Sequence, residues 1–170
     1  MRIYYDTEFT TLDPNVDADM ISIGLVAENG AEFYAEITDF CAEDCSEFVK
    51  TIVLPLLGKG DRPPKRMAGG MLGLALAEWL AQFAGEPIEF ISDSTCDWWL
   101  LLAYAKADLN AQSIDFTGSV WLPSDSVLAA VPVLETELRY WHANPKMKHH
   151  ALYDARRLKL IAERQRELLA

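Results

Sequence analysis

The chain has 170 residues, of which 51% are hydrophobic and 24% charged, a balance typical of a globular protein with a sizeable core. Its formal net charge of −11 gives no overall basic field, which argues against a clamp on long nucleic acid. No apolar run approaches the ~20 residues of a membrane span, and the N-terminus lacks the apolar stretch of a secretory signal. We therefore expect one domain, residues 1–170, in a cytoplasmic protein with no membrane partner.

Hydrophobic periodicity and turn signals predict strands and helices that alternate along most of the chain. The Asn29-Gly30 pair separates two expected strands and is typical of a hairpin turn. Strands are expected at 2–8, 20–30, 31–37, 87–91 and 119–122. Helices are expected at 43–57, 71–84, 97–108, 134–143 and 151–169, and a basic, Pro/Gly-rich loop at 58–70. This order predicts an α/β fold with a mixed five-stranded sheet, an antiparallel N-terminal hairpin and flanking helices.

The first strand carries two acids in an otherwise aromatic segment, IYYDTEFT at residues 3–10. Side chains alternate along a strand, so Asp6 and Glu8 project from the same face, about 6–7 Å apart. Their charges repel each other, and the repulsion grows when water is excluded. The segment therefore indicates that a cation binds there.

Two further acids occur where helices are expected to begin. Asp97 opens the apolar segment DWWLLLAYA, and Asp154 lies beside the apolar stripe of the last helix. Each is also explained as a first-turn acid favoured by the helix dipole. Joined with Asp6 and Glu8, however, they could form a cage for two divalent cations. Such a pair clamps the attacking and leaving oxygens of a phosphodiester, and carboxylate ligands suit Mg²⁺ or Mn²⁺.

Two other segments of the sequence also suggest a metal site. The acidic stretch DTEFTTLDPNVDAD, residues 6–19, resembles a calcium loop but lacks the glycine at its sixth position and the flanking helices. Cys41 and Cys45 have a spacing of four and could share a zinc ion, but no histidine or further cysteine lies nearby. Reduced thiols in a cytoplasmic protein are the simpler interpretation.

Three motifs in order, DTE at 6–8, STCDWWLL at 94–101 and HHALYDA at 149–155, resemble those of the DEDDh 3′–5′ exonucleases. These enzymes belong to the ribonuclease H-like superfamily, with the proofreading exonuclease subunits, ribonuclease T and oligoribonuclease. The short chain and its YYDTEF opening are most similar to short bacterial exoribonucleases of the polyadenylate-degrading type. The resemblance implies a ribonuclease H-like fold and hydrolysis of a single-stranded 3′ end, RNA favoured, to nucleoside 5′-monophosphates with two Mg²⁺ or Mn²⁺ ions.

Carried over by position, the resemblance gives each motif residue a role. Asp6 would bridge both metals, and Glu8 would bind one of them and hold the nucleophilic water or the terminal 3′-hydroxyl. Asp97 would bind the second metal and Asp154 the first. His149 would be the general base, on a loop just ahead of the last helix.

Other residues near the motifs admit two interpretations. Thr7, Phe9 and Trp98 are expected to contact the substrate, the aromatic rings by stacking on bases, although core packing also explains either ring. His150 is expected to be a solvated residue at a variable motif position. Asp93 stands where many relatives carry Asn, but a Leu-rich helix follows Asp97, which makes Asp97 the expected ligand.

Further alternatives concern the loop and the function. The cations of the 58–70 loop either contact phosphates or are simply solvated: Lys59, Arg62, Lys65 and Arg66. The main alternative to an enzyme is a non-catalytic relative that binds a nucleic-acid 3′ end or a protein, which a missing acid or histidine would favour. An acidic interaction domain would leave the four inward acids unexplained. A homodimer is compatible with the sequence, and the choice between RNA and DNA depends on contacts to the 2′-hydroxyl.

Overall fold

The computed structural model describes residues 1–13 and 17–170, apart from the side chains of 127 and 128. Part of the stretch considered as a calcium loop, residues 14–16, lies outside the described residues. The strands are β1 (Arg2–Phe9), β2 (Met20–Ala27), β3 (Glu32–Ile37), β4 (Lys65–Met67), β5 (Ile88–Ser92) and β6 (Phe116–Val120). The α-helices are α1 (Leu72–Leu80), α2 (Thr95–Ala111), α3 (Val127–Ala143) and α4 (Ala151–Leu169).

The strands form one mixed sheet in the order β4-β3-β2-β1-β5-β6. β1, β2 and β3 are antiparallel neighbours, whereas β5 runs parallel to β1, and β6 parallel to β5. The expected α/β fold with an antiparallel N-terminal hairpin is therefore confirmed, and the order β3-β2-β1-β5 is ribonuclease H-like.

The expected number of strands was wrong, because the described sheet has six strands rather than five. The additional strand, β4, comes from the segment expected to be a loop and pairs parallel to β3, with Lys65 opposite Ala35. Its sequence, KRM, is short and mostly charged and has no apolar alternation. Its pairing with the sheet edge therefore depends on tertiary contacts that the local sequence does not reveal.

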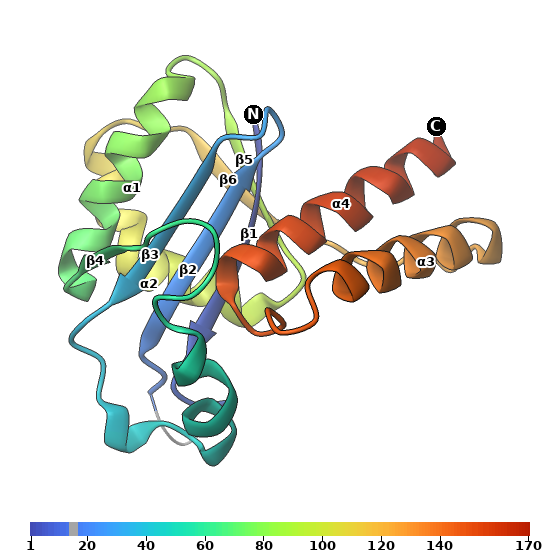
Figure 1. The fold of residues 1–170 in the computed structure, drawn as a ribbon. Helices are drawn as coiled ribbons and strands as arrows, with labels where there is room; N and C mark the ends of the chain where they lie inside the picture. The colour runs from blue at the N-terminus through green and yellow to red at the C-terminus, as the bar shows by residue number, and fades with distance from the viewer. Residues whose placement is uncertain (14–16) are drawn as a thin grey trace.

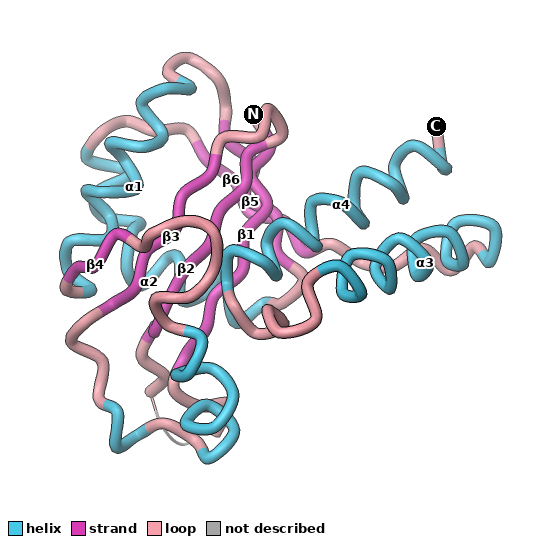
Figure 2. The backbone as a smooth tube through the Cα atoms, in the orientation of Figure 1, coloured by secondary structure: helices cyan, strands magenta, loops and turns pink. Residues whose placement is uncertain are grey.

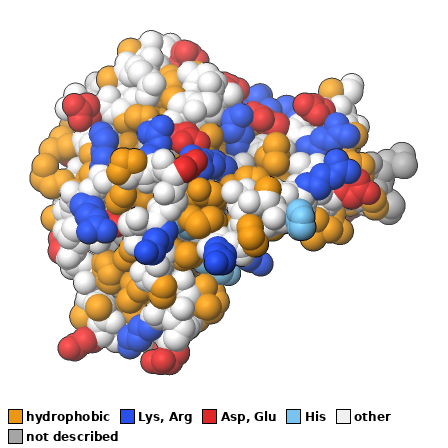
Figure 3. Space-filling model, viewed as in Figure 1, with side chains coloured by type: hydrophobic (Ala, Val, Ile, Leu, Met, Phe, Trp, Pro, Cys, Tyr) orange, Lys and Arg blue, Asp and Glu red, His pale blue; other side chains and the backbone are white. Residues whose placement is uncertain are grey.

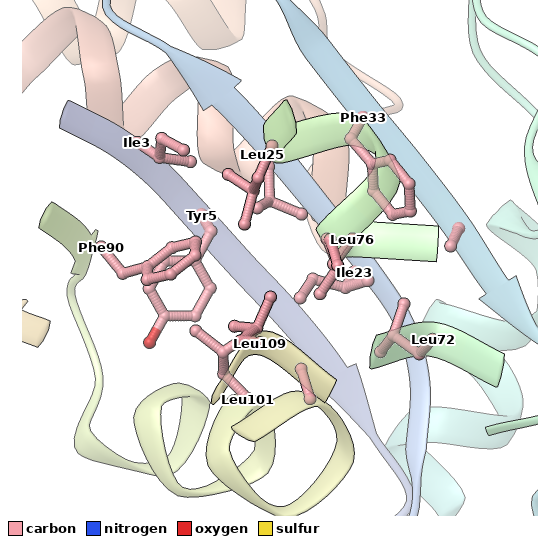
Figure 4. Close-up of a cluster of buried hydrophobic side chains, with 14 of the residues drawn as sticks. Ile3, Tyr5, Ile23, Leu25, Phe33, Leu72, Leu76, Phe90, Leu101 and Leu109 are labelled. Carbon is pink, nitrogen blue, oxygen red and sulfur yellow. The ribbon is translucent and has the colours of Figure 1, made fainter. Parts of the chain in front are cut away.

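Helices cover the sheet on both faces (Figures 1 and 2). α1 and α2 pack on one face, where the largest cluster of buried side chains lies between them and the strands; Figure 4 shows Tyr5, Phe33 and Leu101 in this cluster. α4 packs on the opposite face across β1 and β2, and α3 lies against α4. The α3–α4 pair extends beyond the edge of the sheet (Figure 1).

The segment 43–57 is not the single α-helix that was expected. It contains 3₁₀ turns at Ala42–Asp44 and Leu54–Leu56, and a π-helical turn at Val49–Val53. Phe48, Ile52 and Leu56 have helical spacing in the sequence, but Phe48 is 51% exposed, and Val49 and Val53 are the buried residues. Apolar residues on two sides of this segment hid the true inward face. The consequence is an exposed aromatic ring at this end of the sheet.

The other helices follow the sequence more closely. α4 has the expected bounds, α2 is slightly longer than expected, and α3 begins earlier, at Val127, with Pro132 inside it. α1 is flanked by 3₁₀ turns at Gly69–Met71 and Ala81–Phe83. Within the described parts of the chain, no helix combines the length and apolar character needed to cross a bilayer.

Candidate metal centre and active site

The C-terminal half of β1 presents two acids to the face that α4 covers. Asp6 lies opposite Gly24 of β2, and Glu8 lies opposite Ser22. A Cβ atom on Gly24 would lie only 2.3 Å from the Cα of Leu152, because the first turn of α4 packs directly on β2 at this point. The glycine thus permits the close approach that brings Asp154, on the same helical turn, to Asp6.

Asp97 reaches the same end of β1 from the other face of the sheet. It lies in the first turn of α2, which Ser94 caps by accepting a hydrogen bond from the Cys96 amide, at 3.1 Å. The Thr7 hydroxyl donates to Asp97 Oδ1 at 2.6 Å, and the Thr7 amide donates to the same oxygen at 3.3 Å. The side chain is 2% exposed, and its Oδ2 is buried without a hydrogen-bond partner among the described residues.

The acids form two groups that share Asp6. Asp6, Glu8 and Asp154 form one group, in which each residue offers an oxygen within 4.8 Å of the others. Asp6, Asp93 and Asp97 form the second group by the same measure. All the donors are carboxylate oxygens, and the buried Asp97 Oδ2 needs a positive partner. The residues therefore fit hard divalent cations such as Mg²⁺ or Mn²⁺.

Asp93 was not expected to share this site. In the structure it lies beside Asp97 and also forms an ion pair with Arg157 of α4. Arg157 in turn binds Glu137 of α3 at 2.8 Å. The sequence hint was Asp93 itself, an acid where an asparagine is common, but only the fold shows it next to Asp6.

Burial and mutual repulsion shift the pKa values of the four acids upward. The pKa of Glu8 is raised from 4.5 to about 8, first by burial and then by Asp154 and Asp97. Burial likewise raises the pKa of Asp97 and of Asp154 from 3.8 to about 7. The pKa of Asp6 is raised well above its usual value by burial and then by the charge of Asp154. Without a cation, the site therefore retains protons near neutral pH.

His149 lies in the turn immediately before α4. Its backbone is left-handed, with φ of 67°, and its amide donates to Asp154 Oδ2 at 2.8 Å. The half-buried imidazole lies edge-to-face against Phe48, with ring centroids 5.0 Å apart. Burial, and then the charge of Lys148, lowers the pKa of His149. The ring is consequently neutral at physiological pH and able to accept a proton.

His150 does not have the solvated position that was expected. It is 2% exposed, stacks on Tyr34 with ring centroids 4.6 Å apart, and places Nε2 3.1 Å from the carbonyl oxygen of Lys59. The two adjacent histidines therefore face different surroundings, His149 at the acids and His150 in the packing behind them. Neighbouring positions in the sequence gave no signal of this difference.

The acids and His149 line one pocket of about 750 Å³. Thr7 and Phe9 line it as well, together with four apolar residues that the sequence analysis did not assign to the site: Leu12, Phe48, Val49 and Val53. Leu12 is 78% exposed, so its side chain is open to a ligand in the pocket. Trp98 is not among the described residues that line the pocket. It packs against Phe116 and over Gly118 of β6 instead.

Comparison with known proteins adds one decisive similarity, although no family model matches the chain. The chain is 32% identical over 168 residues to the 3′–5′ exoribonuclease Rv2179c of Mycobacterium tuberculosis strain ATCC 25618 / H37Rv. The alignment covers 92% of this chain and 88% of the relative. This chain belongs to the same 3′–5′ exoribonuclease family. The 3′–5′ exoribonuclease MT2234.1 of strain CDC 1551 / Oshkosh matches with the same identity and coverage, and family membership confirms the expected class of enzyme.

Proposed function

We propose that this chain is a metal-dependent 3′–5′ exoribonuclease of the DEDDh type, which releases nucleoside 5′-monophosphates from a single-stranded 3′ end. The observation that supports this most is the meeting of Asp6, Glu8, Asp97, Asp154 and His149 in one pocket. The preference for RNA rests on the name of the mycobacterial relatives. The likeness to ribonuclease T and oligoribonuclease stays a motif-level proposal.

The carboxylates would bind two cations, one in each of the two acid groups. Asp6 belongs to both acid groups and is suited to bridge the two sites. Glu8 and Asp154 complete one site, and Asp97, with Asp93 beside it, completes the other. When bound, the pair of Mg²⁺ or Mn²⁺ ions would supply the positive charge that stabilises the phosphodiester oxygens during displacement.

His149 is proposed to move the proton. Its neutral imidazole lines the pocket and accepts a proton from the attacking water as the oxygen of the water bonds to phosphorus. The bond between phosphorus and the 3′-oxygen of the preceding nucleotide breaks, and that oxygen takes up a proton to become the new 3′-hydroxyl. The hydrogen bond that the His149 amide donates to Asp154 Oδ2 ties the position of the base to a proposed metal ligand. The Thr7 hydroxyl donates a hydrogen bond to Asp97, so we assign Thr7 to positioning this ligand rather than to substrate contact.

The apolar side of the pocket is proposed to hold the terminal nucleotides. Phe9, Leu12 and Phe48 line this side; Phe9 is partly buried, whereas the ring of Phe48 is exposed, and exposed aromatic rings stack on bases regardless of sequence. Phe48 also contacts His149, which places a base stacked there next to the proton acceptor. Trp98 has no part in this proposal because its ring is packed on β6.

A substrate panel tests the proposed function. Single-stranded RNA carrying a 5′ label is incubated with Mn²⁺ or with EDTA, in parallel with the same RNA bearing a 3′-phosphate and with DNA of the same sequence. We expect products that shorten one nucleotide at a time from a free 3′-hydroxyl, only with the metal, and faster on RNA than on DNA. Binding of the 3′ end without any cleavage would instead support the non-catalytic relative.

A further inference from the structure

The loop before β4 and the first two residues of β4 contain four cations, of which Arg62 and Arg66 form ion pairs and Lys65 lies 5.4 Å from the centroid of the Phe33 ring. Arg62 lies 3.3 Å from Glu32, and Arg66 lies 3.1 Å from Glu36. Lys59 is exposed and has no ion-pair partner among the residues that the structure describes. Its charge is therefore available to a ligand.

The backbone around Lys59 is firmly anchored. Glu36 is 3% exposed, and its carboxylate accepts hydrogen bonds from the Gly58 amide, the Tyr34 hydroxyl and the Arg66 guanidinium. Farther along the loop, Asp61 binds Arg156 of α4 at 2.9 Å. Because these contacts already order the backbone of the loop, a ligand that binds Lys59 loses little affinity to the entropy cost of ordering that backbone.

The anchored loop packs against the segment that precedes α4. The carbonyl oxygen of Lys59 meets His150 Nε2 at 3.1 Å, and a Cβ on Gly60 would lie 3.6 Å from Met147 Cε. Lys146 and Lys148 flank Met147, are exposed, and likewise have no ion-pair partner within the described part of the chain. Figure 3 shows Lys and Arg side chains gathered on this face of the molecule.

We propose that Lys59, Lys146 and Lys148, here called the lysine rim, bind backbone phosphates of the RNA upstream of its 3′-terminal nucleotide. The inference rests on the proposed function of the pocket. Lys148 is adjacent to His149, so the rim begins beside the acids. Ammonium groups bind phosphates as point charges without reading the bases, which suits an enzyme that moves along a strand.

Local cations are needed here because the rest of the molecule repels RNA. The net charge is −11, and divalent cations offset the acids only at the scissile end of the strand. Phosphates farther upstream lie beyond the pocket, and the lysine rim offers them a cationic surface that begins next to His149. A strand held at both places would be retained between successive cleavages.

The test compares a dinucleotide, which is too short to reach the rim, with a heptanucleotide. The variant K59Q/K146Q/K148Q should reduce the ratio of heptanucleotide to dinucleotide kcat/KM by about tenfold or more, through KM. Each lost phosphate contact removes about 0.7 from the slope of log KM against log salt, so that the slope should fall by about 2. The double variant K59Q/K146Q should show an intermediate loss with Lys148, the neighbour of His149, still present.

The control is Lys106→Gln, which removes an exposed lysine from α2 on the opposite face of the sheet. It should leave the length preference and the salt slope as in the wild type. An unaltered length preference and salt slope in the triple variant, with hydrolysis intact, would overturn the lysine rim and leave the proposed function standing. Failure of the wild type to hydrolyse either RNA would overturn the proposed function itself.

Discussion

The Thr7 hydroxyl and Asp97 Oδ1 are joined by a 2.6 Å hydrogen bond in the interior of the protein. The bond fixes one oxygen of Asp97 and leaves the other, Oδ2, free for a cation. We predict that Thr7→Val weakens Mn²⁺ binding about 10- to 100-fold, the usual cost of losing a group that orients a metal ligand. Thr7→Ser retains the hydroxyl and should bind nearly as the wild type does. Titration calorimetry with Mn²⁺ measures both, and equal affinities for the two variants would contradict the role of the bond.

Asp6→Asn should stabilise the metal-free protein while it destroys the site. Burial, and then the charges of four other acids, raise the pKa of Asp6, so neutralising its side chain relieves repulsion. Thermal unfolding at pH 8 in EDTA should show a higher melting temperature for the variant than for the wild type. Added Mg²⁺ should raise the melting temperature of the wild type and have little effect on that of the variant.

The stability of the metal-free protein should depend on pH in an unusual direction. The pKa of Glu8 is raised from 4.5 to about 8, and the pKa of Asp97 and of Asp154 from 3.8 to about 7. At pH values between the unfolded and the folded pKa of each group, the folded protein holds more protons than the unfolded chain. The contribution of these groups to the free energy of unfolding therefore falls as pH rises through this range. Urea unfolding in EDTA from pH 5 to pH 8 measures this trend. The same measurements on Asp6→Asn serve as the reference. A free energy of unfolding that rises with pH in the wild type relative to this variant would contradict the upward pKa shifts.

Metal binding should release protons for the same reason. Near pH 7 the acids retain part of their protons until a cation displaces them, so that Mn²⁺ affinity should increase from pH 6 to pH 8. Calorimetry in two buffers with different ionisation enthalpies gives the number of protons released. A binding enthalpy independent of the buffer would show that the acids are already ionised.

Replacing each of the two histidines by alanine should have a different effect, on turnover for His149 and on stability for His150. His149→Ala should lose most of the turnover with Mn²⁺ affinity and melting temperature close to those of the wild type. His150→Ala removes a buried ring that packs on Tyr34, and should cost about 3 kcal/mol of unfolding free energy. The neutral His149 ring also predicts that turnover at saturating metal rises with pH below, not above, its ordinary pKa of 6.5. If His150→Ala lost turnover without losing stability, His150 rather than His149 would be the general base.

Much of this site could be predicted because its signals are local. Asp6 and Glu8 stand out in an apolar strand, and Asp97 and Asp154 begin helices whose periodicity is clear. The features that were missed depend on tertiary contacts. Gly24 matters only because α4 crosses β2 there, and Asp93 matters only because its loop ends beside Asp6. Likewise, β4 exists because its three residues meet the edge of the sheet, and Phe48 is exposed because Val49 and Val53 face inward.

Gly24→Ala tests how α4 is positioned over the sheet. The added methyl group would lie 2.3 Å from the backbone of Leu152, so α4 must shift and carry Asp154 away from Asp6. We predict a loss of about 3 kcal/mol or more in unfolding free energy and weaker Mn²⁺ binding. Gly70→Ala is a matched control, because nothing lies within 4 Å of its added Cβ. Similar losses in both variants would mean that the close approach at Gly24 is not what positions the helix.

The most direct test of the account is the turnover of Asp6→Asn beside that of the wild type at saturating Mn²⁺, on single-stranded RNA with a 5′ label. The wild type should shorten the RNA stepwise from its 3′ end and release nucleoside 5′-monophosphates. The variant should be slower by about a hundredfold or more, because the shared ligand of both cation sites has lost its charge. Turnover of Asp6→Asn close to that of the wild type, or efficient cleavage of circular RNA by the wild type, would contradict the assignment of this pocket as an exonuclease site.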